Sequence, residues 1–244
     1  MSNMSEGINE FTLGDLTLDE MIKIISLLEN PPEAAGVRKA LRFYEVPKAL
    51  NHFKWGSVNG LMEVLNHYAM PQNKSELEWM LTFIKGKNSL LEIGSSFGGT
   101  LKHMASVMNK GSKIVSVDLP IDTTPKFLNP LASLKDTCRK IGWMGGNVEL
   151  IVGDSHDYRV VAIAGKYAPF DFGFIDGDHS YEGVKEDWEN YGPMCKIVGF
   201  HDIAGPVEGC ARFWQELKAS TKYRVEQFIS DAERKFGIGL VFRE

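Results

Sequence analysis

Several patterns that mark common protein classes are absent or scarce in this chain of 244 residues. It has 3 cysteines, Cys138, Cys195 and Cys210, and no CxxC pair. An odd number of isolated cysteines indicates reduced thiols in a cytoplasmic protein and argues against a zinc site. The chain lacks an apolar run long enough to span a bilayer, and its polar, acidic N-terminus is unlike a signal peptide. We therefore expect a cytoplasmic protein with no membrane partner.

Positive charge is not in excess either. The formal net charge is -5, which gives no general attraction for nucleic acid or for an anionic membrane. Hydrophobic residues make up 43% of the chain and charged residues 24%, as in ordinary globular proteins. The length suffices for one large α/β domain with an appendage or for two small domains.

What the chain does contain is organised around residues 89–100, Ser-Leu-Leu-Glu-Ile-Gly-Ser-Ser-Phe-Gly-Gly-Thr. The apolar run 89–93 is short and predicts a buried strand. The glycines that follow permit a sharp turn and a close approach of a ligand to the backbone. After Thr100 the apolar residues follow a helical period. The unit is therefore a strand, a glycine turn and a helix, the first half of a nucleotide-binding α/β unit.

Strands and helices alternate after this turn. Apolar runs predict strands over 113–117, 148–152, 170–175 and 196–200, and amphipathic patterns predict helices over 127–141, 158–166, 183–191 and 208–219. The last two predicted strands, 223–229 and 237–242, are separated only by a loop and should form a hairpin. Such alternation requires a parallel sheet covered by helices on both faces. We expect a Rossmann-like, doubly wound, mostly parallel sheet of seven strands with a C-terminal antiparallel hairpin.

The first third of the chain has helical patterns instead. Residues 1–74 predict a helical cover or lid, and residues 75–244 predict the main domain, which would begin with a helix over 75–84 capped by Ser75. The cover should pack beside the glycine turn. It could fold over its own site or form a homo-oligomer.

Polar residues follow each of the first five predicted strands. They are Gly94 with Ser95, Asp118, Asp154 with Ser155, Asp176 with Asp178 and His179, and His201 with Asp202. Any one of these acids could simply cap a helix or start a turn. Five such groups at one edge of a sheet instead indicate a ligand site, because ligands of these folds bind beyond the carboxyl ends of the strands.

A dinucleotide cofactor is disfavoured. Asp118 lies 24 positions after Gly94, a spacing that suits an acid on a ribose. The fingerprint GxGxxG is incomplete, however, because Ser96 stands where its second glycine should be. An acid-rich edge would also repel a pyrophosphate, whereas it suits a cationic ligand.

These residues carry a family resemblance. The matching segments are 91–100, Asp118, Gly153-Asp154-Ser155 and the run 170–184, Phe-Asp-Phe-Gly-Phe-Ile-Asp-Gly-Asp-His-Ser-Tyr-Glu-Gly-Val. From about Ser75 to the C-terminus the chain resembles the S-adenosylmethionine-dependent methyltransferases of the Rossmann-like class. Within it, the chain is similar to small O-methyltransferases that include cephalosporin-hydroxylase-like and macrolide-sugar enzymes. One departure is Met194-Cys195-Lys196 in place of a Pro-Gly-Gly before the fifth strand.

The resemblance implies S-adenosylmethionine as cofactor. The glycine turn would hold its methionine end, with Glu92 ordering the loop or meeting the ammonium group. Asp118 would accept hydrogen bonds from the ribose hydroxyls and Asp154 one from the adenine amino group. The residues expected to bind it are Glu92, Gly94, Ser95, Phe97, Gly98, Asp118, Leu119, Asp154, Ser155 and Asp176.

A divalent cation and a base could activate the acceptor hydroxyl. Asp176, His201 and Asp202 end adjacent strands, and their donor atoms suit Mg²⁺ or Mn²⁺. Alternatively, Asp176 only orients the cofactor and the other two form a turn. His179 is a candidate general base, acting beside Asp176, because a histidine there would titrate near neutrality; alternatively it is a helix cap. His156 is expected at the surface.

The function predicted is an S-adenosylmethionine-dependent O-methyltransferase, assisted by a divalent cation, that acts on a small hydroxylated molecule such as a sugar or natural-product intermediate. A non-catalytic sensor or scaffold that binds S-adenosylmethionine is the alternative, as is a hydroxylase-like enzyme on the same fold. A nucleic-acid methyltransferase is disfavoured by the net charge and by the absence of an Asn-Pro-Pro-Tyr-type motif.

Overall fold

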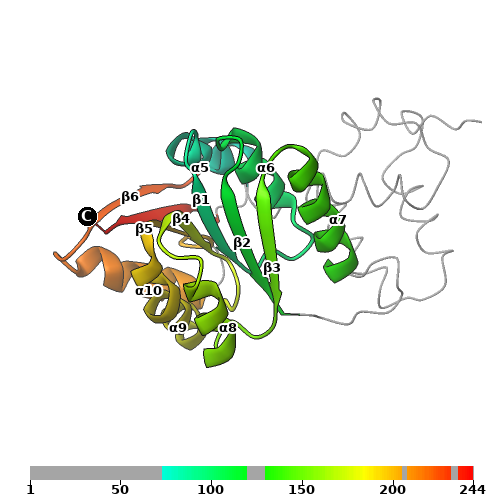
Figure 1. Ribbon diagram of the computed structural model, residues 1–244. Coiled ribbons are helices and arrows are strands. Elements are labelled where there is room, and N and C mark those ends of the chain that lie inside the picture. Colours follow the sequence, from blue (N-terminus) through cyan, green and yellow to red (C-terminus); the bar gives the residue numbers. More distant parts are fainter. Residues whose placement is uncertain (1–72, 120–129, 205–207, 232–235, 244) are drawn as a thin grey trace, which may run out of the picture. The chain divides into compact units, whose positions relative to one another are not determined.

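The computed structural model describes residues 73–119, 130–204, 208–231 and 236–243 (Figure 1). These residues belong to one compact unit, which comprises 72–122 and 130–244. The predicted cover, residues 1–74, lies outside the described residues except for its last two positions. The start of the helix predicted over 127–141 also lies outside them. The boundary at residue 74 therefore stays a prediction.

A seven-stranded sheet forms the centre of this unit. Its strands are β1 (Ser89–Ile93), β2 (Lys113–Asp118), β3 (Asn147–Val152), β4 (Phe170–Ile175), β5 (Cys195–Phe200), β6 (Arg224–Phe228) and β7 (Ile238–Phe242). Their order is β3-β2-β1-β4-β5-β7-β6, and the first five are parallel. β7 runs antiparallel to both of its neighbours, β5 and β6. The predicted Rossmann-like fold, including the C-terminal hairpin, is confirmed.

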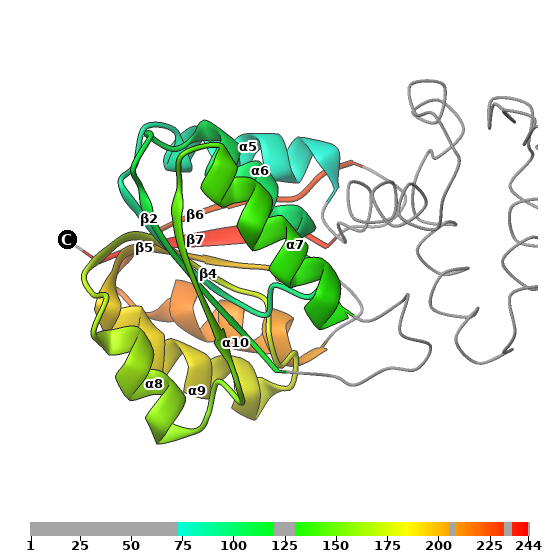
Figure 2. The same cartoon turned by 45° about the vertical axis from the view of Figure 1, so that its right-hand side comes forward.

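Helices cover both faces of the sheet, as Figures 1 and 2 show. On one face lie α5 (Lys74–Ile84), α6 (Gly99–Val107) and α7 (Pro130–Trp143). On the other lie α8 (Tyr158–Gly165), α9 (Tyr181–Tyr191) and α10 (Glu208–Ala219). β1 is buried at all five positions because it runs between β2 and β4 under both helical layers. The strand order reverses at β1 and β4, which is where ligands of doubly wound sheets bind.

Two helix starts differ from the prediction. α5 begins at Lys74 with Asn73 at its N-cap, so Ser75 lies inside the first turn and does not cap the helix. α9 begins at Tyr181, and the hydroxyl of Ser180 caps it by accepting a hydrogen bond from the Gly183 amide at 2.9 Å. Ser180, and not His179, is therefore the cap of this helix. A local pattern does not reveal which of several polar residues takes the extended backbone that a cap requires.

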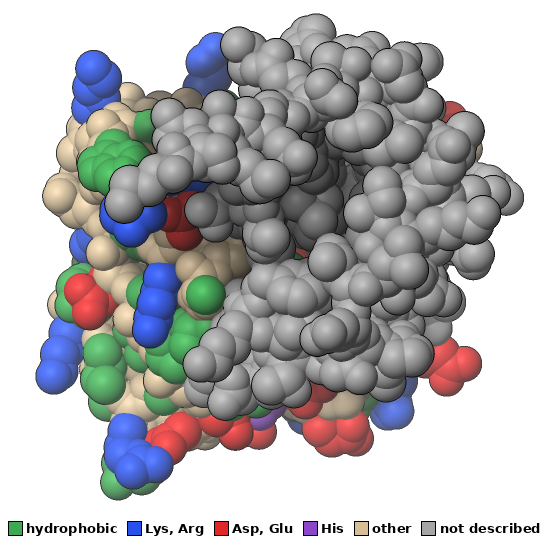
Figure 3. All heavy atoms as spheres, turned by 90° about the vertical axis from the view of Figure 1, so that its right-hand side faces the viewer, with side chains coloured by type: hydrophobic (Ala, Val, Ile, Leu, Met, Phe, Trp, Pro, Cys, Tyr) green, Lys and Arg blue, Asp and Glu red, His purple; other side chains and the backbone are tan. Residues whose placement is uncertain are grey.

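Among the described side chains visible in Figure 3, Lys and Arg lie mainly on the left, next to hydrophobic groups, and many of the acids lie along the lower edge. Two large aromatic side chains are strongly exposed, Trp143 at 73% and Tyr158 at 78%. Within the described ranges, no helix has the length and apolar character needed to cross a membrane.

Candidate active site

The glycine turn after β1 is in backbone contact with the end of β4. Gly94 has a φ of +83°, and a Cβ there would collide with the carbonyl group of Asp176. The Asp176 amide in turn donates to the carbonyl of Ile93 at 2.9 Å. Only glycine combines the left-handed backbone with this close approach. The turn therefore brings the end of β4 directly beside the end of β1.

Beneath the turn, Glu92 is almost completely buried. The Ser95 hydroxyl donates to its Oε2 at 2.5 Å, and the hydroxyls of Ser95 and Ser116 are 2.7 Å apart. Burial raises the pKa of Glu92 to about 8, although the Ser95 hydrogen bond acts against this. Of the two roles expected for Glu92, this arrangement matches the ordering of the loop.

A cavity of about 410 Å³ lies at the carboxyl ends of β1 to β4. The described residues that line it are Ile93, Gly94, Ser96, Val117, Asp118, Leu119, Gly153, Asp154, Ser155, His156, Asp176, Gly177 and Asp178. Among the residues predicted to bind a cofactor, those in this lining are Gly94, Asp118, Leu119, Asp154, Ser155 and Asp176. The acids that end β2, β3 and β4 thus line one cavity.

The remaining predicted cofactor residues, Glu92, Ser95, Phe97 and Gly98, are not among the lining residues. Phe97 and Gly98 meet α7 instead. The Thr137 hydroxyl donates to the Phe97 carbonyl at 3.4 Å, and a Cβ at Gly98 would press against the Thr137 side chain. These contacts join segments about forty residues apart, so the turn's own sequence does not reveal them.

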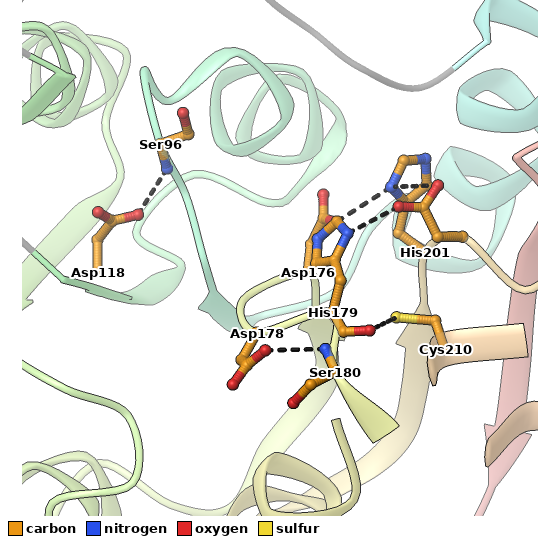
Figure 4. Close-up of polar contacts among 9 residues, drawn as sticks. Ser96, Asp118, Asp176, Asp178, His179, Ser180, His201 and Cys210 are labelled. Carbon is orange, nitrogen blue, oxygen red and sulfur yellow. Dashed lines mark hydrogen bonds and ion pairs between the residues drawn. The ribbon is translucent and has the colours of Figure 1, made fainter. Parts of the chain in front are cut away.

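Asp118, at the end of β2, is held by the glycine turn (Figure 4). Its Oδ2 accepts a hydrogen bond from the Ser96 amide at 2.6 Å. Ser96 has a positive φ of 51°, which directs this amide towards the carboxylate. Burial raises the pKa of Asp118, against the lowering effect of the Ser96 and Ser95 amides. Ser96 is a cavity residue that the sequence did not single out.

His156 differs from the prediction. It lines the cavity, and only 23% of its side chain is exposed, because its ring packs between the β3 turn and α9. Its Nε2 lies 3.3 Å from Oδ1 of Asp187, a completely buried residue of α9. The partner stands 31 positions further along the chain, so this contact follows from the packing of α9 alone.

Two histidines converge on Asp176 at the end of β4. His179 Nε2 lies 3.3 Å from Asp176 Oδ1, and His201 Nδ1 lies 3.0 Å from the same oxygen (Figure 4). Burial would raise the pKa of Asp176, but the two imidazoles together lower it to about 2. Asp176 is therefore ionised at neutral pH.

His179 also reaches Asp202. Its Nδ1 lies 2.9 Å from Asp202 Oδ2, so that its ring lies between two carboxylates. Hydrogen bonds with Asp176 and Asp202 raise the pKa of His179 to about 10. The expectation that His179 titrates near neutrality does not hold in this arrangement, since the imidazole is protonated at neutral pH.

Asp176, His179 and Asp202 offer ligand atoms that all lie within 4.8 Å of one another. The predicted metal set was Asp176, His201 and Asp202, so His179 stands in the place of His201. His201 is 2% exposed, and its Nε2 has no hydrogen-bond partner in the described part of the chain. It contacts this group only through Nδ1, towards Asp176 and Asp202.

Comparisons with known proteins agree with this architecture. Residues 91–203 match a family described as a methyltransferase domain. No curated protein sequence matches the chain. Among solved structures, an O-methyltransferase from Bacillus cereus in complex with S-adenosylhomocysteine is 18% identical, with a TM-score of 0.58, and the match covers 76% of this chain and 89% of that one.

Two further solved structures have the same fold. The O-methyltransferase TomG from Streptomyces achromogenes, involved in tomaymycin synthesis and solved with S-adenosylmethionine, is 16% identical, with coverage of 84% and 98% and a TM-score of 0.56. A methyltransferase from Geobacter sulfurreducens is 19% identical, with coverage of 78% and 89% and a TM-score of 0.52. Residues 91–203 thus match the methyltransferase-domain family, and the solved structures share the Rossmann-like fold of this chain.

Proposed function

We propose that this protein is an O-methyltransferase that transfers the methyl group of S-adenosylmethionine to a small hydroxylated molecule, such as a sugar or a natural-product intermediate, with the assistance of a divalent cation. The observation that carries the proposal is the placement of Asp118, Asp154 and Asp176 on one cavity at the switch point of the sheet. The group formed by Asp176, His179 and Asp202 begins at the same strand end.

The cavity suits a cationic nucleoside. Its volume of about 410 Å³ lies in the range of small-molecule sites. Its described lining contains four acids, Asp118, Asp154, Asp176 and Asp178, which favour the positive sulfonium of the methyl donor. We assign Asp118 to the ribose hydroxyls, Asp154 to the adenine amino group and the Gly94 turn to the methionine end.

Methyl transfer from a sulfonium is an in-line displacement, so the acceptor oxygen must be held opposite the methyl group. The hydroxyl must also lose its proton. His179 cannot remove it while its pKa stays at about 10, since the imidazole is then already protonated. Neutral His179 requires that something else compensate the charges of Asp176 and Asp202.

A divalent cation meets this requirement. Asp202 Oδ1 is buried and has no hydrogen-bond partner among the described residues, so this oxygen has a coordination position to offer. Asp176, Asp202 and neutral His179 would hold the ion, and this mixed oxygen and nitrogen set suits Mn²⁺ at least as well as Mg²⁺. When bound, the ion would supply Lewis acidity that lowers the pKa of the acceptor hydroxyl, so that its proton could leave to solvent water while His179 holds the ion. His201 would keep Asp176 oriented through its Nδ1 contact.

Residues 1–74 are assigned the role of cover and of acceptor recognition. This part of the proposal rests on the sequence pattern, and the acceptor is left as a class of small hydroxylated molecules. A homo-oligomer and a cytoplasmic location are likewise expectations from the sequence.

Calorimetry with S-adenosylhomocysteine tests the donor site without knowledge of the acceptor. We expect micromolar binding by the parent protein and a loss of roughly tenfold or more in Asp118→Ala, because the ribose loses a charged hydrogen-bond acceptor. Asp136→Ala, at an ion pair on the surface of α7, is the matched control. If Asp118→Ala binds as tightly as the parent, the assignment of the ribose site is wrong. Repeating the titration with Mn²⁺ or Mg²⁺ shows whether the ion binds with the cofactor product.

A further inference from the structure

The turn that follows β3 is attached to α9 by two side chains. The Tyr191 hydroxyl donates to the carbonyl oxygen of Ser155 at 2.8 Å. His156 Nε2 lies 3.3 Å from the carbonyl oxygen of Gly183 and 3.3 Å from Asp187 Oδ1. Both attachments hold the short segment that contributes Asp154, Ser155 and His156 to the cavity wall.

Asp187, which faces the His156 ring, is a buried acid inside a helix. It is completely buried in the middle of α9, and a Cβ at the cavity residue Gly177 would come within 3.2 Å of its Oδ2. Burial raises the pKa of Asp187 to about 6, while Ser155 and His156 act in the opposite direction. Neither carboxylate oxygen of Asp187 has a hydrogen-bond partner among the described residues, and His156 Nε2 lies within ion-pair distance of Oδ1. A buried carboxylate is costly unless a basic group faces it, and the imidazole of His156 is placed to be that group.

The other side of His156 faces Asp154. The His156 amide donates to Asp154 Oδ1 at 2.9 Å, and His156 Nδ1 lies 3.7 Å from the same oxygen. One residue thus contacts the Asp154 carboxylate with its backbone and approaches it with its ring. The Asp154 side chain is 61% exposed, so without these contacts its carboxylate would rotate freely in the cavity mouth.

We propose that His156, held at Nε2 by Asp187 and the Gly183 carbonyl, is a positioning residue that fixes the Asp154 carboxylate and thereby makes the site selective for the amino group of adenine. The inference rests on the proposed function, in which Asp154 accepts a hydrogen bond from that amino group. A fixed carboxylate accepts from an amino group and repels the carbonyl oxygen that hypoxanthine carries at the same place. A mobile carboxylate would turn away and discriminate less.

The test compares the binding of S-adenosylhomocysteine with that of S-inosylhomocysteine, which has a carbonyl oxygen in place of the amino group and carries a proton on the neighbouring ring nitrogen N1. The amide nitrogen of glutamine can reach the position of a histidine Nε2, whereas that of asparagine stops near Nδ1. We therefore expect His156→Gln to keep most of the parent's selectivity. In His156→Asn the ratio of the two affinities should fall roughly five- to tenfold, which is about the effect of one hydrogen bond.

Asp187→Asn provides the second arm, because it removes the charge that holds the ring while keeping the shape of the side chain. Its selectivity should fall in the same direction as that of His156→Asn. His103→Asn, on α6 and away from the cavity lining, is the matched control. Thermal unfolding of each variant verifies that it is folded.

The outcomes separate this inference from the proposed function. If the parent binds S-adenosylhomocysteine selectively and Asp118→Ala weakens it, but both His156 variants and Asp187→Asn keep the parent's selectivity, the positioning role is refuted while the donor site stands. If His156→Gln and His156→Asn lose selectivity equally, the anchoring of the His156 ring through its Nε2 is also refuted. If the parent binds neither compound, the proposed function fails and the inference fails with it.

Discussion

His179 Nδ1 lies 2.9 Å from Asp202 Oδ2, and through this contact the loop after β4 meets the loop after β5. The other ring nitrogen of His179 faces Asp176, so one imidazole lies between two carboxylates. The His179 imidazole between these two carboxylates keeps its proton unless a metal cation binds there in the proton's place.

In metal-free protein, the His179 imidazole should stay protonated well above neutral pH, because its pKa is raised to about 10 by the two carboxylates. A raised histidine pKa stabilises the fold fully below the unfolded value near 6.5 and ceases to do so as the pH rises through about 10. Histidine NMR signals recorded against pH in the presence of a chelator measure the pKa directly. Asp202→Asn should lower it, whereas a His179 midpoint near 6.5 in the parent would contradict the arrangement.

Mn²⁺ binding should depend more on His179 than on His201. His179 belongs to the group of atoms within 4.8 Å of one another, whereas His201 is buried behind Asp176. We expect His179→Gln, which removes a ligand, to weaken Mn²⁺ binding more than His201→Gln does. The loss in His201→Gln should be roughly tenfold, at the lower end of the range for residues that orient a metal ligand. Paramagnetic relaxation of water protons measures the affinity. A larger loss in His201→Gln would restore the set predicted from the sequence.

Glu92 should make the stability of the fold depend on pH. Its pKa rises from 4.5 to about 8 because the carboxyl is buried, so the unfolded chain ionises first as the pH increases. The contribution of Glu92 to the free energy of unfolding is full below about pH 4.5, falls as the pH rises towards 8, and then levels off. Glu92→Gln should lack this fall. Urea unfolding of both proteins across this range checks it, and parallel curves would show that Glu92 does not ionise on unfolding.

Gly94→Ala should destabilise the domain far more than Gly111→Ala. Both glycines have a positive φ, of 83° and 79°, so both substitutions strain the backbone by about 1 kcal/mol. Only at Gly94 would the added Cβ also collide with the Asp176 carbonyl, whereas it meets open space at Gly111. The difference between the two free energies of unfolding isolates the collision. Similar values for both would mean that the end of β4 can move away from the turn.

Local patterns in the chain were enough to predict the sheet. β1 and β4 have the predicted bounds, and the hairpin of β6 and β7 was expected from the short loop between them. Runs of apolar residues report burial, and glycine at a turn reports a backbone that other residues avoid. Parallel strands place their carboxyl ends at one edge, so the convergence of Asp118, Asp154 and Asp176 could also be inferred before the structure.

Contacts between the loops could not be inferred in this way. Nothing in the segment around His156 indicates that Asp187 will lie beside it. The residues near His179 likewise do not indicate that its ring contacts Asp202, or that His201 faces Asp176. These pairings depend on how α9 packs on the sheet and on the rotation of each side chain about its own bonds. The amino-acid order determined the strands, the turn and the edge at which acids gather, since those depend on neighbours along the chain. Only the tertiary structure decided which histidine stands between which carboxylates, because that depends on distances across the fold.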